Sequence, residues 1–357
     1  MIYSEYLPRV DSVSVFLDFD EQVKDINQIF LESDDVLKVV TKVEYSITLA
    51  HRVKQLKIQR LNLINSCLQI TLLVGDADTT TNNDNVDSFL NTHLDKWSCK
   101  DLQRITPKID GSNVFEFTCK YCQSVIVNSK DYKFLDMPSE YWYEFMDYWH
   151  CHKPHSDEKY DKNYGQLKPP NEFTVLLGSH YLLLHGNGNL RSRNGLALCK
   201  NCQKSLGVET STLSKLFKWN LQLNYDGHQQ QYPYRMFIYN LIVDKVNSHA
   251  ARKFSFEFDN KVWYLWVTNI GLDVSINLEK LTNTLKMLYY HADLNTCEND
   301  SEYESIDIPS EIRSGFIQML TSITEKLPMQ MRKVVMGKQS FSVSNFSVLN
   351  DANELTR

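Results

Sequence analysis

The sequence is poor in glycine and lacks the glycine-rich loops with which nucleotide-binding proteins hold phosphate. Only 12 of the 357 residues are glycine, and no P-loop motif occurs. The G-x-S-x-G motif of serine hydrolases and the H-E-x-x-H motif of zinc peptidases are also absent. These absences disfavour a nucleotide-binding fold, and they remove the commonest local signatures of hydrolytic enzymes.

Long basic runs are missing too. The formal net charge is −6, and the densest basic stretch, residues 326–338, holds only four Lys or Arg residues. Because phosphate contacts dominate the affinity of nucleic-acid binders, such proteins usually carry a basic face. The composition therefore disfavours direct binding of RNA or DNA, although a local basic patch is compatible with a net-acidic chain.

No apolar run approaches the roughly 18 residues that a membrane-spanning helix needs. The chain starts with MIYSEYLPRV, which has neither the positive leader nor the apolar core of a signal peptide. We therefore expect no membrane partner and an intracellular protein, located in nucleus and cytoplasm. In those compartments, the eight cysteines would be thiols or metal ligands rather than disulfides.

Apolar and polar residues alternate in much of the chain, as is typical of strands with one buried face. The pattern predicts strands at 13–19, 43–49 and 68–74, and a hairpin of 254–258 with 262–267. Another hairpin is predicted for 173–177 and 181–185, with its turn at Gly178 and Ser179. We expect an α+β chain with largely antiparallel sheet.

Helical spacing of apolar residues appears in three places. An aromatic helix is predicted to begin at Pro138 and to end near Trp149, and Pro309 marks the start of another helix over 312–327. Leucines at 278, 281, 285 and 288 predict a third helix. At roughly 100–200 residues per domain, we divide the chain into a β-rich segment 1–110, a metal-binding core 111–210 and an α+β segment 211–357 that packs on the core.

Two Cys-x-x-Cys pairs are the sharpest chemical signal. Cys119 and Cys122 form the first pair, and Cys199 and Cys202 the second. Each three-residue step lets two thiolates on one tight turn reach the same ion, so two turns complete a tetrahedral zinc site. A single pair would equally fit a redox motif or free thiols, but two pairs in one intracellular chain favour structural Zn²⁺.

A second cluster comprises His150, Cys151 and His152, with His155 nearby. Cys151 and His152 are alternative metal ligands. Cys151 could also act as a nucleophile with a histidine base, as in thiol catalysis. The third interpretation is that these residues end a packed helix. His180 and His185 flank an apolar strand, and we interpret both as satisfied residues of the sheet.

The middle third resembles the HECT-like family of ubiquitin-conjugating-enzyme-binding proteins. The segments that carry the resemblance, in the family's order and approximate spacing, are TCKYC at 118–122, LDMPSEYW at 135–142, DYWHCH at 147–152, LLGSHYLLLH at 176–185 and LCKNCQKSLG at 198–207. The resemblance is specific over this region and loose in the outer thirds. The zinc-pinned hairpins are also similar to β-tent domains, such as the ligand-binding domain of cereblon.

Within this family, the chain is similar to a fungal branch whose members act in pre-mRNA 3′-end cleavage and polyadenylation. The resemblance implies that the cleavage endonuclease subunit is a partner. Animal relatives are described as ubiquitin ligases that accept ubiquitin from a conjugating enzyme, and Cys151 is the position that such an activity would use. A zinc-stabilised binding protein is favoured over a ligase, because four thiolates leave no open metal position and no acid–base motif is present.

Overall fold

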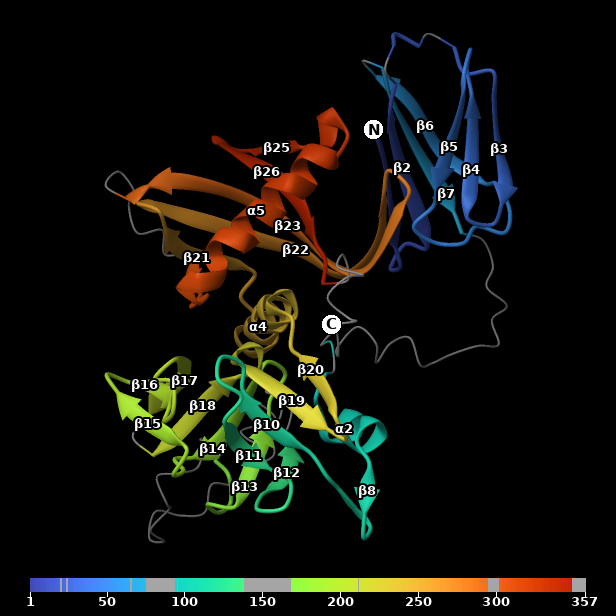
Figure 1. Ribbon diagram of the computed structural model, residues 1–357. Helices are drawn as coiled ribbons and strands as arrows, with labels where there is room; N and C mark the ends of the chain where they lie inside the picture. Colours follow the sequence, from blue (N-terminus) through green and yellow to red (C-terminus); the bar gives the residue numbers. More distant parts are fainter. Residues whose placement is uncertain are drawn as a thin grey trace, which may run out of the picture. The chain divides into compact units, whose positions relative to one another are not determined.

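The computed structural model describes residues 1–348 except 20, 24, 65, 75–93, 95, 138–167, 211 and 295–301. The chain forms two compact units (Figure 1). The terminal unit combines Met1–Thr92 with Ala251–Arg357, and the inserted unit is His93–Ala250. The sequence suggested three successive segments, 1–110, 111–210 and 211–357. The contacts instead unite the two ends of the chain, because the first strand pairs with a strand beyond residue 260.

A ten-stranded sheet forms most of the terminal unit. Its main path runs β25-β26-β23-β22-β1-β2-β7-β6, with β21 and β24 beside β22. The strands are β1 (Ile2–Leu7), β2 (Ser12–Asp18), β6 (Ile58–Ile64), β7 (Cys67–Leu73), β21 (Lys253–Phe258), β22 (Lys261–Ile276), β23 (Glu279–Asp293), β24 (Glu304–Ser305), β25 (Lys333–Met336) and β26 (Gln339–Phe346). All its neighbours are antiparallel except β21 and β24.

A three-stranded antiparallel sheet shares a core with β2 and β7. It consists of β3 (Gln28–Ser33), β4 (Val36–Val40) and β5 (Glu44–Thr48). Alternate residues of the facing strands, such as Val15, Leu37 and Ile70, are fully buried in one cluster. Strand prediction from alternation was therefore confirmed at β2, β5 and β7, where buried apolar residues recur at every second position.

The helix predicted from the leucines at 278–288 is wrong. Leu281, Leu285 and Leu288 lie on β23, and Leu278 is 70% exposed in the turn that joins β22 to β23. β23 buries residues on both of its faces, and its pairing with β22 contains three register shifts. The leucine spacing therefore reflects two buried faces and irregular pairing rather than one helix face.

The helix predicted at 312–327 was confirmed as α5 (Ser310–Lys326). It buries Ile312, Phe316, Leu320 and Ile323, which lie on one stripe at helical spacing. Phe316 contacts Phe256 of β21 and Phe346 of β26, so the helix covers the face of the sheet that these strands share (Figure 1). A short 3-10 turn, η3 (Met329–Met331), follows.

The inserted unit contains two main sheets. The seven-stranded sheet has the order β12-β13-β14-β18-β17-β16-β15, and the four-stranded one β11-β10-β19-β20. Their strands are β10 (Glu116–Cys119), β11 (Val125–Asn128), β12 (Lys133–Asp136), β13 (Thr174–Leu177), β14 (Tyr181–His185), β15 (Leu190–Arg193), β16 (Leu196–Cys199), β17 (Ser205–Thr210), β18 (Leu213–Phe217), β19 (Leu221–Tyr225) and β20 (His228–Gln231). A two-stranded ribbon, β8 (Lys108–Ile109) with β9 (Ser112–Asn113), completes the strands in the described part of this unit.

Among its described residues, the inserted unit has two helices and one 3-10 turn: α2 (Cys99–Ile105), η1 (Lys218–Asn220) and α4 (Tyr234–His249). The hairpin predicted around Gly178 was confirmed as β13 and β14. The aromatic helix predicted for 138–149 lies outside the described residues. The sequence did not reveal α4, because its buried residues Phe237, Ile238, Tyr239 and Ile242 surround the helix instead of forming one stripe.

The described part of the chain is thus mostly antiparallel β-sheet with three α-helices. The α+β class and the antiparallel sheet expected from the sequence were confirmed. None of the described helices is both long enough and apolar enough to cross a membrane.

Candidate metal centre

Two turns of the same geometry carry the four paired cysteines. In the turn after β10, Cys119 N donates to Ser124 O and Gln123 N to Cys119 O, at 2.9 and 2.8 Å. In the turn after β16, Cys199 N donates to Lys204 O and Gln203 N to Cys199 O, both at 2.9 Å. Each turn closes through a glutamine with positive φ, 60° at Gln123 and 61° at Gln203. The sequence prediction of two matching turns on hairpins was confirmed.

The sulfur atoms of the two turns meet. Cys119 Sγ lies 3.6 Å from Cys202 Sγ, and Cys122 Sγ lies 3.6 Å from Cys199 Sγ. All four lie within 4.8 Å of one another. A disulfide would need about 2.05 Å, whereas a tetrahedron with metal–sulfur bonds of about 2.3 Å has edges of about 3.8 Å. The four cysteines could therefore hold one metal ion.

The surroundings of the sulfurs favour a thiolate at Cys122 and protonated thiols at Cys119 and Cys199. Burial raises the pKa of Cys119 to about 12, and it also raises the pKa of Cys199. Burial opposes ionisation of Cys122 as well, but hydrogen bonds from Ser124 and contacts with Cys202 and Cys199 lower its pKa to about 6. A bound cation would be needed to ionise Cys119 and Cys199 at neutral pH.

Side chains outside the turns join them to each other and to the sheets. Asn201 Nδ2 donates to Ser124 Oγ at 3.0 Å, which connects the second turn to the first. Asn187 and Asn189 both donate to Ile126 O from the loop before β15. Tyr121 OH donates to Asn220 Oδ1. These bonds position the ligand turns independently of any ion.

The second candidate cluster lies outside the part of the chain that the structure describes. Cys151 and His152, proposed as alternative ligands or as nucleophile and base, lie outside the described residues, as does His155. Cys67 and Cys99 are described, and burial raises the pKa of each to about 12. Neither has the thiolate character that a cysteine nucleophile requires.

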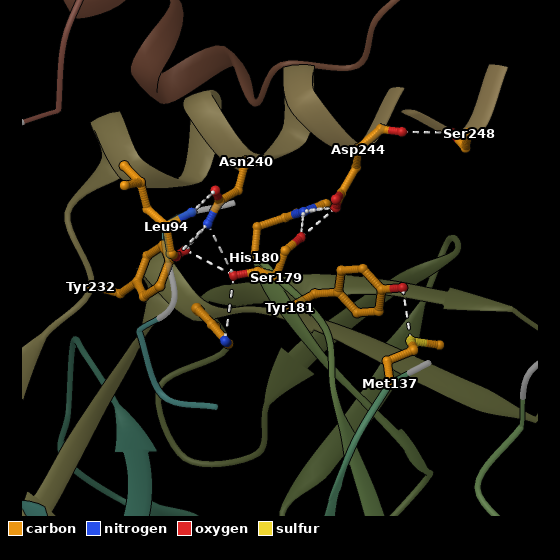
Figure 2. A network of polar contacts seen from close by, with 10 residues as sticks. Leu94, Met137, Ser179, His180, Tyr181, Tyr232, Asn240, Asp244 and Ser248 are labelled. Carbon is orange, nitrogen blue, oxygen red and sulfur yellow. Dashed lines mark hydrogen bonds and ion pairs between the residues drawn. The ribbon is translucent and has the colours of Figure 1, made fainter. Parts of the chain in front are cut away.

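A polar network lies beneath helix α4, where the turn after β13 meets the helix (Figure 2). His180 Nδ1 contacts Asp244 Oδ2 at 2.8 Å and Ser179 Oγ at 3.0 Å, and Ser179 Oγ also donates to Asp244. His180 and Asp244 are 2% and 7% exposed. Asp244 therefore fixes the tautomer in which Nδ1 of His180 carries a proton.

The carbonyl oxygen of Ser179 is the second centre of this network. It accepts from Tyr232 OH at 2.9 Å, from Asn240 Nδ2 at 3.3 Å and from Lys218 Nζ at 3.4 Å. Lys218 also donates to Lys96 O, and Asn240 bonds the backbone of Leu94 in both directions. The network thus fastens the start of the inserted unit to its core.

Sequence reasoning missed most of these residues. It singled out His180 as a sheet residue, whereas the structure buries it beside an acid, with its Nε2 lacking a hydrogen-bond partner among the described residues. Asn240 and Asp244 are four residues apart and therefore lie on one face of α4, so their spacing was the signal available. His185 Nε2 lies 3.2 Å from Pro169 O, in agreement with the predicted satisfied sheet residue.

Fold and site together define a mostly antiparallel β protein with a four-cysteine centre that joins two sheets. A protein family described as HECT-like ubiquitin-conjugating enzyme (E2)-binding matches this sequence over residues 5–338. The chain belongs to this family, and the membership inferred from the middle third was confirmed over nearly the whole sequence.

Two yeast proteins are similar to the chain. An uncharacterized protein of Saccharomyces cerevisiae is 26% identical over 356 residues, which cover 92% of this chain and 95% of the relative. An uncharacterized protein of Schizosaccharomyces pombe is 24% identical over 215 residues, which cover 57% of this chain and 54% of the relative. No solved structure matches the chain.

Proposed function

We propose that the protein is a zinc-stabilised binding protein that engages a ubiquitin-conjugating enzyme and contacts the cleavage endonuclease in pre-mRNA 3′-end processing. The family match supports a protein-binding role in the ubiquitin system. The single observation that carries the zinc-stabilised scaffold is the convergence of four sulfur atoms from two distant turns. The role in 3′-end processing rests on the resemblance to the fungal branch, and it goes with a location in nucleus and cytoplasm.

Four thiolates suit zinc in a structural site. They complete the tetrahedron, so no position stays open for a substrate or a reactive water. The ligand hairpins β10–β11 and β16–β17 come from two different sheets. A metal shared between two sheets also supports the similarity to zinc-pinned β-tent domains. Zinc here would clamp segments that are far apart in the sequence, which stabilises the unit instead of performing chemistry.

Metal analysis tests the zinc assignment. Purified protein should contain about one equivalent of zinc, the stoichiometry of a single closed Cys₄ site. Cys119→Ser should lower both the zinc content and the melting temperature, because three sulfurs hold the ion less tightly. Cys67→Ser, which changes a buried cysteine outside the cluster, is the matched control for zinc content. A full-length protein without zinc that melts at the same temperature as the zinc-loaded one would refute the structural role.

A binding protein and a cysteine-dependent ligase make opposite predictions for Cys151. The full-length chain should bind purified ubiquitin-conjugating enzyme in biolayer interferometry, and Cys151→Ala should leave the affinity within about twofold, because no covalent step is involved. With ubiquitin, activating enzyme and ATP added, no reducible ubiquitin adduct should form on the chain. An adduct that dithiothreitol releases and that Cys151→Ala abolishes would establish the ligase instead.

Contact with the endonuclease can be tested independently. The chain is net acidic, which suits a basic partner surface. The association rate with the purified endonuclease subunit should therefore fall as salt rises, because screening weakens electrostatic steering. A rate that does not change with salt would point to an apolar interface, and the absence of binding would remove this partner.

A further inference from the structure

The turn that carries the second cysteine pair lies in a basic part of a net-acidic protein. From residue 173 to residue 208 the sequence contains no Asp or Glu, but it contains Arg191, Arg193, Lys200 and Lys204. Residues 117–130, which carry the first pair, also lack acids and add Lys120 and Lys130. The meeting of the sulfurs brings these two segments together. The resulting surface is cationic although the whole chain has a charge of −6.

Three of the cations on this surface are unpaired within the described part of the chain. Arg191, Arg193 and Lys200 are exposed, and their side chains form neither ion pairs nor hydrogen bonds with the residues that the structure describes. Lys204 Nζ lies 6.0 Å from the centre of the Tyr121 ring, which is 48% exposed. Charges that stabilise a fold are normally paired, so exposed cations on segments that lack acids suit an anionic partner.

β15 is the edge strand of the seven-stranded sheet (Figure 1). A two-residue turn, Asn194 and Gly195 with φ of 53° and 73°, joins it to β16. In such a hairpin the pair next to the turn is hydrogen-bonded, and bonded pairs alternate along the strands. Arg193 and Arg191 therefore bond β16 through their backbones, whereas the N–H and C=O of Ser192 point outward from the sheet.

The side chains of β15 point alternately to the two faces of the sheet, which places its two arginines together. Arg191 and Arg193 project on the same face, because they are two residues apart on a strand. They are opposite Leu198 and Leu196, and Leu196 is 41% exposed. Glu209, the first acid after the basic stretch, is one residue beyond Val208, which pairs with Leu196, so it lies on the other face. An incoming strand would find a backbone edge, two arginines and an apolar side chain on one face.

We propose that β15 accepts an extended acidic segment of a partner protein by strand addition. Main-chain bonds to Ser192 would align the segment, and acidic side chains two residues apart would pair with Arg191 and Arg193. Exposed Leu196 and Tyr121 favour a peptide over RNA, since a mixed apolar and cationic surface is typical of protein interfaces. This surface is independent of the metal's identity and of the partners proposed above.

A designed peptide tests the proposal on the full-length chain. The probe is a fluorescein-labelled octapeptide of alternating Glu and Val, and the measurement is fluorescence anisotropy at low salt. The glutamate peptide should bind, and the same peptide with Lys in place of Glu should not. Arg191→Glu/Arg193→Glu should weaken binding by about tenfold or more, because two attractive pairs become repulsive. Lys108→Glu/Lys133→Glu, an equal charge change on other strands of the inserted unit, should change affinity by less than about twofold.

Ser192→Pro separates strand addition from general attraction. Proline removes the outward N–H but keeps both arginines and the bonds to β16. It should therefore reduce glutamate-peptide binding about as much as the charge reversal, whereas Ser192→Ala should leave it unchanged. The proposal is overturned if Ser192→Pro binds normally, if both charge-reversed pairs weaken binding equally, if a short oligouridine binds more tightly than the peptide, or if no binding is detected. In the last case the arginines only protect the edge from aggregation.

Discussion

His180 is held between an acid and apolar rings. Asp244 contacts its Nδ1, while the rings of Tyr181 and Phe237 approach edge-on at 4.9 and 5.2 Å between centroids. Lys215 on β18 and Lys218 on η1 add positive charge nearby. Burial is the largest influence and lowers the pKa of His180 below 6.5, although Asp244 opposes it. The folded protein therefore keeps this histidine neutral at pH 7.

The neutral histidine predicts a pH-dependent stability of the inserted unit. An unfolded chain protonates His180 near pH 6.5, while the folded chain resists protonation because its pKa is lowered. The stabilising contribution is present above about pH 6.5 and is lost as the pH falls below it. His180→Gln should thus be less stable at pH 7 but show a shallower loss between about pH 6.5 and 5 in urea unfolding. His228→Gln, at an exposed histidine, should keep the wild-type slope, and an unchanged slope in His180→Gln would contradict the assignment.

Gly207 ends the L-C-K-N-C-Q-K-S-L-G segment, and the structure explains the need for glycine there. A Cβ atom at this position would lie 2.0 Å from the carbonyl oxygen of Lys215 on the neighbouring strand. Gly207→Ala should therefore force β17 and β18 apart and destabilise the inserted unit by about 3 kcal/mol or more. Gly188→Ala meets no atom within 4 Å and is the matched control. Urea unfolding of both variants checks this, and a wild-type stability of Gly207→Ala would contradict the packing.

The cysteine site was readable from the sequence because each Cys-x-x-Cys turn is local and chemically distinctive. The sequence contains two Cys-x-x-Cys motifs, so the prediction that they share one ion followed directly. The network around His180 was not readable, since it joins Leu94, Ser179 and Asp244 from three distant segments. The sequence does not reveal which of these residues bond to each other, because the serine, asparagine and aspartate of this network are residue types with many local hydrogen-bonding roles.

At the scale of elements, strands with apolar residues mainly on one face were easier to recognise than strands with apolar residues on both. β2 alternates visibly, whereas β22 and β23 run for 16 and 15 residues with buried side chains on both faces. A continuous apolar strand cannot be told from a buried helix by periodicity alone. The converse case is α4, whose polar residues Asn240 and Asp244 are buried, so its helical period is hidden. Local pattern succeeds where one side faces water and fails where tertiary contacts surround the element.

Helix α5 should anchor the sheet of the terminal unit through one aromatic side chain. Phe316 is fully buried, with ring centroids 5.2 Å from Phe346 and 6.1 Å from Phe256. Phe316→Ala leaves a cavity among these rings and should cost about 3–5 kcal/mol. Hydrogen exchange should accelerate in β21 and β26, while exposed Gln318→Ala should leave their exchange unchanged. Exchange in Phe316→Ala equal to that of the wild type would mean that the helix does not hold the sheet.

At the scale of the whole molecule, strands from before and after the inserted unit form one sheet. β1 pairs both with β2 and with β22, which enters more than 250 residues later, as Tyr3 opposite Ile276 illustrates. The inserted unit begins and ends between these partners in sequence. Such a topology cannot be inferred from local pattern, because long-range strand pairing is set by the whole hydrophobic surface rather than by any one segment. It also confines the four cysteines to one unit.

Confinement of the metal ligands predicts a selective response to metal removal. Chelation of the proposed zinc with 1,10-phenanthroline would free four clustered thiols, and it would remove the proposed cross-link between the β10–β11 and β16–β17 hairpins. Hydrogen exchange measured by mass spectrometry should therefore accelerate in residues 116–128 and 196–217. Strands β1, β2 and β22 should exchange as before, because none of their residues belongs to the cluster. Cys119→Ser should show the same pattern without chelator and respond little when it is added. Acceleration spread equally over both units would mean that the cysteine centre supports the whole molecule, and no acceleration at all would mean that the hydrogen bonds of the two turns suffice without a metal.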